Sequence, residues 1–138
     1  MVWMKYDYLE YPMDQPAFPD LKKIYRPIIR ISIKYQSELD LLAYLDSGSD
    51  FCLFPAEVGE LIGIDSKSGI ASSVTGVGGQ ECPVYYHSVE IAIGGHKKKI
   101  KAGFGEFITI PLLGQIGFFD NFKVKFDFAK KRLEIEPY

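Results

Sequence analysis

Cysteine is scarce in this chain, because only Cys52 and Cys82 occur among its 138 residues. Two thiols are too few for a disulfide framework, and no second pair stands at a zinc-binding spacing. The two histidines, His87 and His96, lie on strand-like segments without further ligands at a suitable spacing. We therefore expect reduced cysteines, no metal site and no cofactor.

Long apolar runs and an excess of charge are also missing. No run approaches the roughly 18 apolar residues that a membrane-spanning helix needs. Residues 1–11 have neither the basic start nor the apolar centre of a secretion signal. The formal net charge is -2, with 25% charged residues, so neither sign dominates. These observations predict a cytoplasmic protein with no membrane partner and no nucleic-acid partner.

The length of the chain allows one domain with a real core, and 47% hydrophobic residues is an ordinary globular composition. Residues 1–27 are rich in proline and show neither helical nor alternating periodicity. We predict that they form an N-terminal arm that lies on the domain or on a partner. The predicted domain covers residues 28–138.

Alternating apolar and polar residues predict strands through most of that domain. The predicted strands are 29–35, 39–45, 70–75, 83–93, 99–107, 108–113, 124–128 and 133–136. Segment 55–63 begins with proline and ends with glycine, which indicates a short helix, and 114–119 is expected to form a helical turn. The fold class predicted is mostly β, a compact barrel-like domain with one or two short helices.

The tetrapeptide Asp46-Ser47-Gly48-Ser49 directly follows an apolar strand pattern. A carboxylate at a strand end has a rigid base, glycine allows the tight turn that presents it, and the hydroxyls can bond to the carboxylate or to the backbone. Alone, this match is weak, since it arises by chance in roughly one of a hundred such chains. In most proteins, a plain Asp-Ser-Gly turn between two strands would be the better explanation.

With two further features, the tetrapeptide resembles the retropepsin-like (retroviral-type) aspartic peptidases, over residues 28 to about 136. The glycine-rich segment stands where that family has its substrate-covering flap, and it consists of Thr75, Gly76, Val77, Gly78, Gly79 and Gln80. Leu112, Leu113 and Gly114 are similar to the segment that braces the catalytic loop in the family. Residues 117–120 and 124–127 resemble prokaryotic single-domain members. The resemblance implies a closed β-barrel with one lobe of the acid protease fold per chain.

It also implies an aspartic endopeptidase in which Asp46 is catalytic. One carboxylate cannot serve as both acid and base, and the chain carries one such tetrapeptide, so the second carboxylate must come from a second subunit. Two carboxylates this close cannot both ionise, and the pair holds one proton. The expected partners are therefore a second copy of the chain and a peptide or protein substrate.

Neighbouring positions have roles implied by the same resemblance. The Ser47 hydroxyl is expected to bond to the opposite loop, and the Ser49 hydroxyl to donate to the carboxylate and favour its charged form, which implies an acidic working range. Asp50 is expected to belong to the substrate loop. Its usual partner in the family is an arginine, and Gln115 stands there instead. A neutral hydrogen bond is weaker than a charge-assisted one, so weaker support of the dimer or the loop is predicted.

Two other functions fit parts of the sequence. A catalytically silent retropepsin-like fold could serve as a dimerisation or peptide-binding module, and Gly78-Gly79 could be a simple hairpin turn. Such a module would not need an ionisable Asp46. Alternatively, the lysines of 97–101 could bind RNA, although a solvated strand edge is the commoner reason for such a run. That hypothesis leaves the Asp46 tetrapeptide unexplained.

Overall fold

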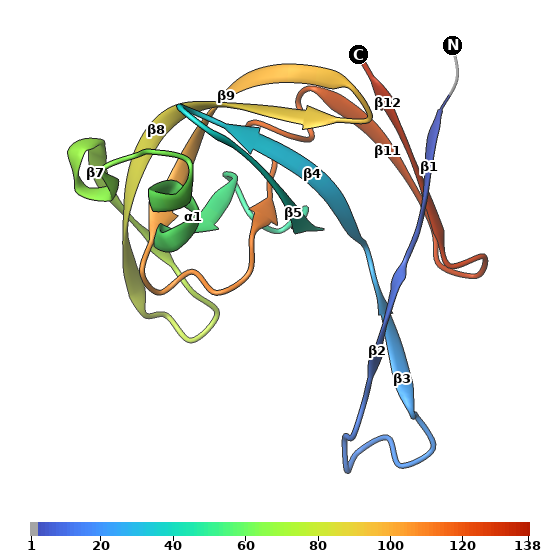
Figure 1. The fold of residues 1–138 in the computed structure, drawn as a ribbon. Coiled ribbons are helices and arrows are strands. Elements are labelled where there is room, and N and C mark those ends of the chain that lie inside the picture. The colour runs from blue at the N-terminus through green and yellow to red at the C-terminus, as the bar shows by residue number, and fades with distance from the viewer. Residues whose placement is uncertain (1–2) are drawn as a thin grey trace.

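The structure is a computed structural model that describes residues 3–138. Strands dominate it, as predicted (Figure 1). In chain order the elements are β1 (Met4–Asp7), β2 (Leu9–Pro12), β3 (Lys23–Arg26), β4 (Ile28–Lys34), β5 (Glu38–Leu45), β6 (Leu53–Pro55), α1 (Ala56–Leu61), the 3-10 helix η1 (Ser66–Ser68), β7 (Ile70–Thr75), β8 (Glu81–Ile93), β9 (His96–Gly105), β10 (Leu112–Leu113), β11 (Phe122–Asp127) and β12 (Arg132–Pro137).

The main sheet has the strand order β4-β5-β10-β6-β9-β8-β7, and β4 pairs in addition with β8. These pairings form a ring from β4 to β8, with β7 attached outside it. Two junctions of the ring are short, because β10 has only two residues and β4 meets β8 over three register pairs. We therefore describe a ring of strands, and not the closed barrel that the sequence predicted.

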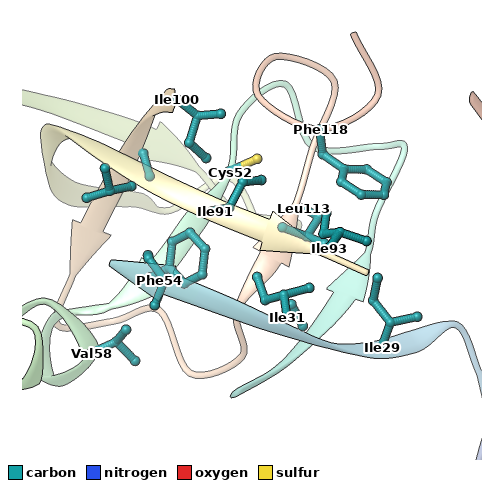
Figure 2. Packing of buried hydrophobic residues seen from close by; sticks show 14 of the residues in the cluster. Ile29, Ile31, Cys52, Phe54, Val58, Ile91, Ile93, Ile100, Leu113 and Phe118 are labelled. Atoms are coloured by element: carbon teal, nitrogen blue, oxygen red, sulfur yellow. The ribbon is translucent and has the colours of Figure 1, made fainter. Parts of the chain in front are cut away.

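Alternation along β4 and β8 builds the core. Ile29, Ile31 and Ile33 of β4 are buried while Arg30 and Lys34 are exposed. Figure 2 shows Ile29 and Ile31 lying near Ile91 and Ile93 of β8. Each fully buried aliphatic side chain of this kind contributes roughly 1.5–3 kcal/mol relative to an exposed one.

The short strand β10 lies between β5 and β6. It runs parallel to β5, with Leu113 opposite Leu45, and antiparallel to β6, with Leu112 opposite Leu53. Leu113 is fully buried. This arrangement sets the end of β5, and hence Asp46, against the segment that the sequence placed in a bracing role.

The N-terminal segment contains strands that the sequence analysis missed. β1 pairs with β12 to form the three-stranded sheet β1-β12-β11, and β2 pairs with β3 in a hairpin that projects from the body (Figure 1). The expectation of no strand pattern here is wrong, because Met4-Lys5-Tyr6-Asp7 does alternate between half-buried and exposed residues. Residues 1–2 lie outside the described range, and the boundary at residue 27 stays a prediction.

Differences elsewhere are local. The predicted strand 108–113 shrinks to Leu112–Leu113, because Pro111 lacks an N–H and Ile110 is exposed. Residues 114–119 form hydrogen-bonded turns without a regular helix. The predicted helix is confirmed as α1, with Val58 buried against the core. In the described part of the chain, no helix combines the length and the apolar character needed to cross a bilayer.

Candidate active site

Asp46 stands at the end of β5 in a turn held on both sides. Its N–H donates to the Leu113 carbonyl at 2.9 Å, and the Leu45 N–H donates to the Pro27 carbonyl at 2.9 Å. Beyond the strand, the Gly48 N–H donates to Asp46 Oδ1 at 3.0 Å, and the Ser49 N–H to the Asp46 carbonyl at 3.1 Å. The half-buried carboxylate therefore keeps one oxygen bonded within its own loop, on a base of main-chain hydrogen bonds.

The bracing segment contacts this loop closely. A Cβ added at Gly114 would lie 2.3 Å from the Phe51 carbonyl oxygen and 2.6 Å from that of Ser49, so a larger residue would force the two segments apart. The Gln115 N–H donates to the Ser49 carbonyl at 2.8 Å, and the Ile116 N–H to the Asp50 carbonyl at 2.9 Å. The structure thus brings Leu112, Leu113 and Gly114 beside the Asp46 loop, and their role in supporting a catalytic loop stays a prediction.

Gln115 adds a support that the sequence did not reveal. Its side-chain Nε2 donates to the Ser47 carbonyl at 2.7 Å. The resemblance predicted that the side chain at position 115 pairs with Asp50. In the structure, Asp50 contacts this segment through its main-chain carbonyl, which accepts a hydrogen bond from the Ile116 N–H. A neutral amide can therefore fasten the loop directly, without a charged partner.

One of the two serines of the loop, Ser49, differs from expectation. The Ser49 hydroxyl donates to the Phe51 carbonyl at 2.7 Å. Because a hydroxyl has a single hydrogen, the predicted donation from Ser49 to the Asp46 carboxylate does not occur here. Ser47 is exposed, and its contact with the loop of a second subunit stays a prediction.

Cys52 lies beneath the loop and joins it to the bracing segment. Its Sγ accepts a hydrogen bond from the Gly114 N–H at 3.4 Å and donates to the Ile116 carbonyl at 3.6 Å. Burial, with a smaller contribution from the Asp120 carboxylate, raises the pKa of Cys52 to about 11. The side chain is therefore a neutral structural thiol, and not a nucleophile.

Phe51, which follows the Asp46 loop, forms an aromatic pair with Tyr86 of β8. The rings of Phe51 and Tyr86 meet edge to face, with centroids 5.7 Å apart. Burial, and to a lesser degree the Asp50 carboxylate, raises the pKa of Tyr86. The Tyr86 phenol is consequently neutral at physiological pH.

The predicted flap is the turn between β7 and β8. The Gly76 N–H donates to the Gln80 carbonyl at 2.8 Å, and the Gly79 N–H to the Gly76 carbonyl at 3.0 Å. Gly79 has a φ of 82°, a conformation that favours glycine, and Val77 at the tip is fully exposed. The turn is thus compact, with an apolar side chain that covers nothing within its own chain.

Asp46 and this turn face one cleft of about 580 Å³. Its lining residues are Asp46, Gly48, Ser49, Asp50, Phe51, Leu53, Ser73, Val74, Thr75, Gly76, Val77, Gln80, Cys82, Phe107, Ile108 and Leu112. Gly78 and Gly79 belong to the turn but do not line the cleft. Both charged side chains of the lining are carboxylates. Across the described residues, no group of three or more potential His, Cys, Asp or Glu ligands could hold a metal ion.

Phe107 and Ile108 are cleft residues that the sequence analysis missed. Their apolar character had placed them at the junction of two predicted strands, yet they follow β9 in a loop, with Phe107 largely exposed. A signal was available in Gly105 before them and Pro111 after them, which together favour a loop. These side chains give the cleft an apolar wall.

The fold is similar to that of a solved retroviral protease, EIAV protease complexed with the inhibitor HBY-793. The TM-score is 0.56 and the sequence identity 21%, over 65% of this chain and 82% of that chain. No protein-family profile and no curated protein matches the sequence. The retropepsin-like fold is therefore confirmed at the level of structure, whereas membership of the prokaryotic group stays a prediction.

Proposed function

We propose that this protein is an aspartic endopeptidase that acts as a homodimer, in which Asp46 of each subunit supplies half of a catalytic carboxylate pair. The observation that carries the proposal is the position of Asp46 in a braced turn, in the same cleft as the Thr75–Gln80 turn. The fold similarity to a retroviral protease complexed with an inhibitor supports it.

A second subunit would complete the chemistry. In a symmetric dimer with Asp46 at the two-fold axis, each carboxylate meets its own copy without any further residue. Close approach of two such groups favours the state that holds one proton between them. One carboxylate is then available as a base and the other as an acid.

Hydrolysis would follow from that single proton. The ionised Asp46 takes a proton from a water molecule, whose oxygen attacks the carbonyl carbon of the peptide bond. The protonated Asp46 of the partner subunit transfers its proton to the carbonyl oxygen, which gives a tetrahedral diol. When the diol collapses, one of its hydroxyl protons passes to the ionised carboxylate, the protonated carboxylate gives its proton to the nitrogen, and the carbon–nitrogen bond breaks. The pair again holds one proton.

The cleft favours extended peptides with apolar side chains. Leu53, Val74 and Ile108 line it, and Val77 of the flap has no cover within its own chain. An extended substrate between flap and carboxylates could pair with main-chain groups as an added strand. We expect cleavage at bonds flanked by apolar residues, because these lose the most water-exposed area on binding.

The test is cleavage of a diverse peptide library by wild type and by Asp46→Asn. Asparagine keeps the size of the side chain but cannot take the proton from water, so we expect the cleavage rate to fall by roughly 10²–10⁴-fold. The matched control is Asp40→Asn, which makes the same change at an exposed position of β5. Pepstatin should inhibit wild type.

The outcomes separate the hypotheses. Equal rates for wild type and Asp46→Asn would remove Asp46 from the mechanism. A wild-type dimer that binds peptides in this cleft but never cleaves them would indicate the silent binding module instead. The cytoplasmic location stays a prediction that this experiment does not address.

A further inference from the structure

The hairpin of β2 and β3 projects from the body of the fold (Figure 1) and is largely exposed to solvent. Its strands pair from Leu9 opposite Arg26 to Pro12 opposite Lys23, and the Met13 N–H extends the ladder to the Lys22 carbonyl at 2.9 Å. Within the described residues, β2 and β3 form a sheet of their own. The hairpin extends well beyond the body in Figure 1, and residues 14–23 are exposed.

The root of the hairpin, at Tyr8 and Pro27, is attached to the body by a main-chain hydrogen bond on each side. These two bonds set the direction of the hairpin. On the β2 side, the Tyr8 N–H donates to the Lys131 carbonyl at 2.9 Å, and on the β3 side the Pro27 carbonyl accepts from Leu45. The Lys131 ammonium also lies 5.1 Å from the centre of the Tyr25 ring. Main-chain bonds on two sides make the hairpin a directed projection, and not a loose tail.

The tip is ordered and presents apolar side chains. The Phe18 N–H donates to the Gln15 carbonyl at 2.9 Å, and the Leu21 N–H to the Phe18 carbonyl at 3.0 Å. Phe18 is 60% exposed and Leu21 41% exposed. An isolated two-stranded hairpin is marginally stable in water, and a large aromatic side chain on a rigid support is typical of an interface anchor. The tip therefore has the features of a surface that a partner covers.

The charges of the hairpin argue against an anionic partner. Residues 9–26 carry three acidic side chains, Glu10, Asp14 and Asp20, and three basic ones, Lys22, Lys23 and Arg26, so their formal charges cancel. Binding to nucleic acid or to an anionic membrane depends on an excess of basic side chains. A protein surface is the better match.

The position of the root favours a second copy of the chain as that protein. Pro27 is bonded to Leu45, the residue before Asp46, and the proposed dimer brings Asp46 to the two-fold axis. The root therefore lies close to that axis. In Figure 1 the hairpin extends toward the same side of the molecule as the turn between β7 and β8, where the second subunit would close the cleft. Four residues of strand already carry the chain roughly 13 Å outward.

We propose that residues 9–26 form a dimerisation arm, whose tip residues Phe18 and Leu21 are buried against the body of a second copy. The inference rests on the homodimer of the proposed function. Two-fold symmetry repeats the contact, so each dimer contains two arm contacts. The arm would hold the two Asp46 loops together from outside the catalytic centre.

The test is the dimer dissociation constant of the full chain, measured by sedimentation equilibrium for wild type and for Phe18→Asp/Leu21→Asp. We expect the constant to rise at least tenfold, because two charges per arm would be buried on dimerisation. The circular dichroism spectrum should not change, since both side chains are exposed in the single chain. The control is Leu61→Asp, which places one such charge at a 65% exposed position of α1 and should leave the constant unchanged.

A second measurement does not depend on affinity. A photo-reactive benzophenone side chain at position 18 should give, on irradiation, a covalent species of twice the chain mass. An unchanged dissociation constant for the arm variant, or cross-links only within one chain, would overturn the arm while leaving the peptidase proposal intact. A dimer that depends on the arm but whose cleavage does not depend on Asp46 would support the arm and overturn the proposed chemistry. A wild type that is monomeric at all concentrations would overturn both.

Discussion

Gln115 shows how one side chain can hold the Asp46 loop from outside it. Its Nε2 reaches the Ser47 carbonyl while its N–H reaches that of Ser49. The hydrogen bond from the Gln115 side chain is exposed, so its net contribution to the free energy of unfolding is modest. Its effect on the position of the Asp46 loop can still be large. Removal of the Gln115 side chain should therefore affect the catalytic rate more than the free energy of unfolding.

We predict that Gln115→Ala lowers the free energy of unfolding by about 1 kcal/mol, the value of a typical hydrogen bond. The catalytic efficiency kcat/KM should fall by a larger factor, because the turn that presents Asp46 loses a support. Denaturant unfolding and steady-state kinetics measure the two effects. Gln115→Arg is the control, since it keeps a donor at this position. Full kcat/KM in the alanine variant would show that the bond does not position the loop.

Cys52 provides a second prediction at this scale. Its buried thiol should resist a thiol reagent at neutral pH in the folded protein, whereas Cys82, which lines the cleft, should react. Mass spectrometry of the labelled chain identifies the modified residue. Equal labelling of both cysteines in folded protein would contradict the burial of Cys52.

The raised pKa of Cys52 also predicts a pH dependence with a definite sign. The pKa is about 11 in the folded chain and 9.0 without burial, so the unfolded state loses this proton first as the pH rises. Wild type should therefore lose stability relative to Cys52→Ala between these two values, by on the order of 2 kcal/mol. Well below pH 9, where the thiol is protonated in both states, the difference between the two proteins should be constant. Denaturant unfolding at several pH values measures it.

At the scale of elements, the turn between β7 and β8 can be compared with the turn between β8 and β9. Gly79 and Gly95 have positive φ values of 82° and 85°, and a Cβ at either position would meet no atom within 4 Å. Valine should therefore impose a similar backbone strain at both sites. Only the first turn contributes residues to the cleft.

We accordingly predict that Gly79→Val and Gly95→Val destabilise the fold by similar amounts, while only Gly79→Val cuts turnover strongly. A stiffer flap would impair closure over the substrate. Thermal unfolding and kcat are the two measurements. If Gly79→Val and Gly95→Val lowered kcat by similar factors, the turn between β7 and β8 would have only a structural role.

At the scale of the whole molecule, the proposed mechanism requires two intact chains for each active centre. Mixing wild type with an equal amount of Asp46→Asn should form mixed dimers that contain one functional carboxylate. If both chains associate equally well, cleavage should fall to about half of that given by the same wild-type chains alone. The measurement is the initial rate after the subunits have exchanged. The same amount of Asp40→Asn is the control and should not lower the rate, and no loss with Asp46→Asn would mean that one chain suffices.

Much of this architecture could be predicted from local patterns. Isoleucines at every second position of β4 indicated its buried face, and proline and glycine marked both ends of α1. The paired glycines located the turn between β7 and β8, and the Asp46 tetrapeptide located the loop. The failures occurred where local pattern and tertiary neighbours disagree. Phe107 and Ile108 are apolar but have no strand beside them, and the prolines of the N-terminal segment obscured the alternation of β1.

The sequence by itself determined the features that depend on neighbouring residues: the faces of the strands, the tight turn at Gly48 and the direction of the carboxylate leaving β5. Only the tertiary structure decided the features that depend on distant residues. β10 lies between β5 and β6, with Leu113 opposite Leu45 and Leu112 opposite Leu53. The Ser49 hydroxyl donates to the Phe51 carbonyl, and the Gln115 side chain donates to the Ser47 carbonyl. A hydrogen-bond donor chooses among the acceptors that packing brings within reach, and no local pattern specifies which distant carbonyl will be there.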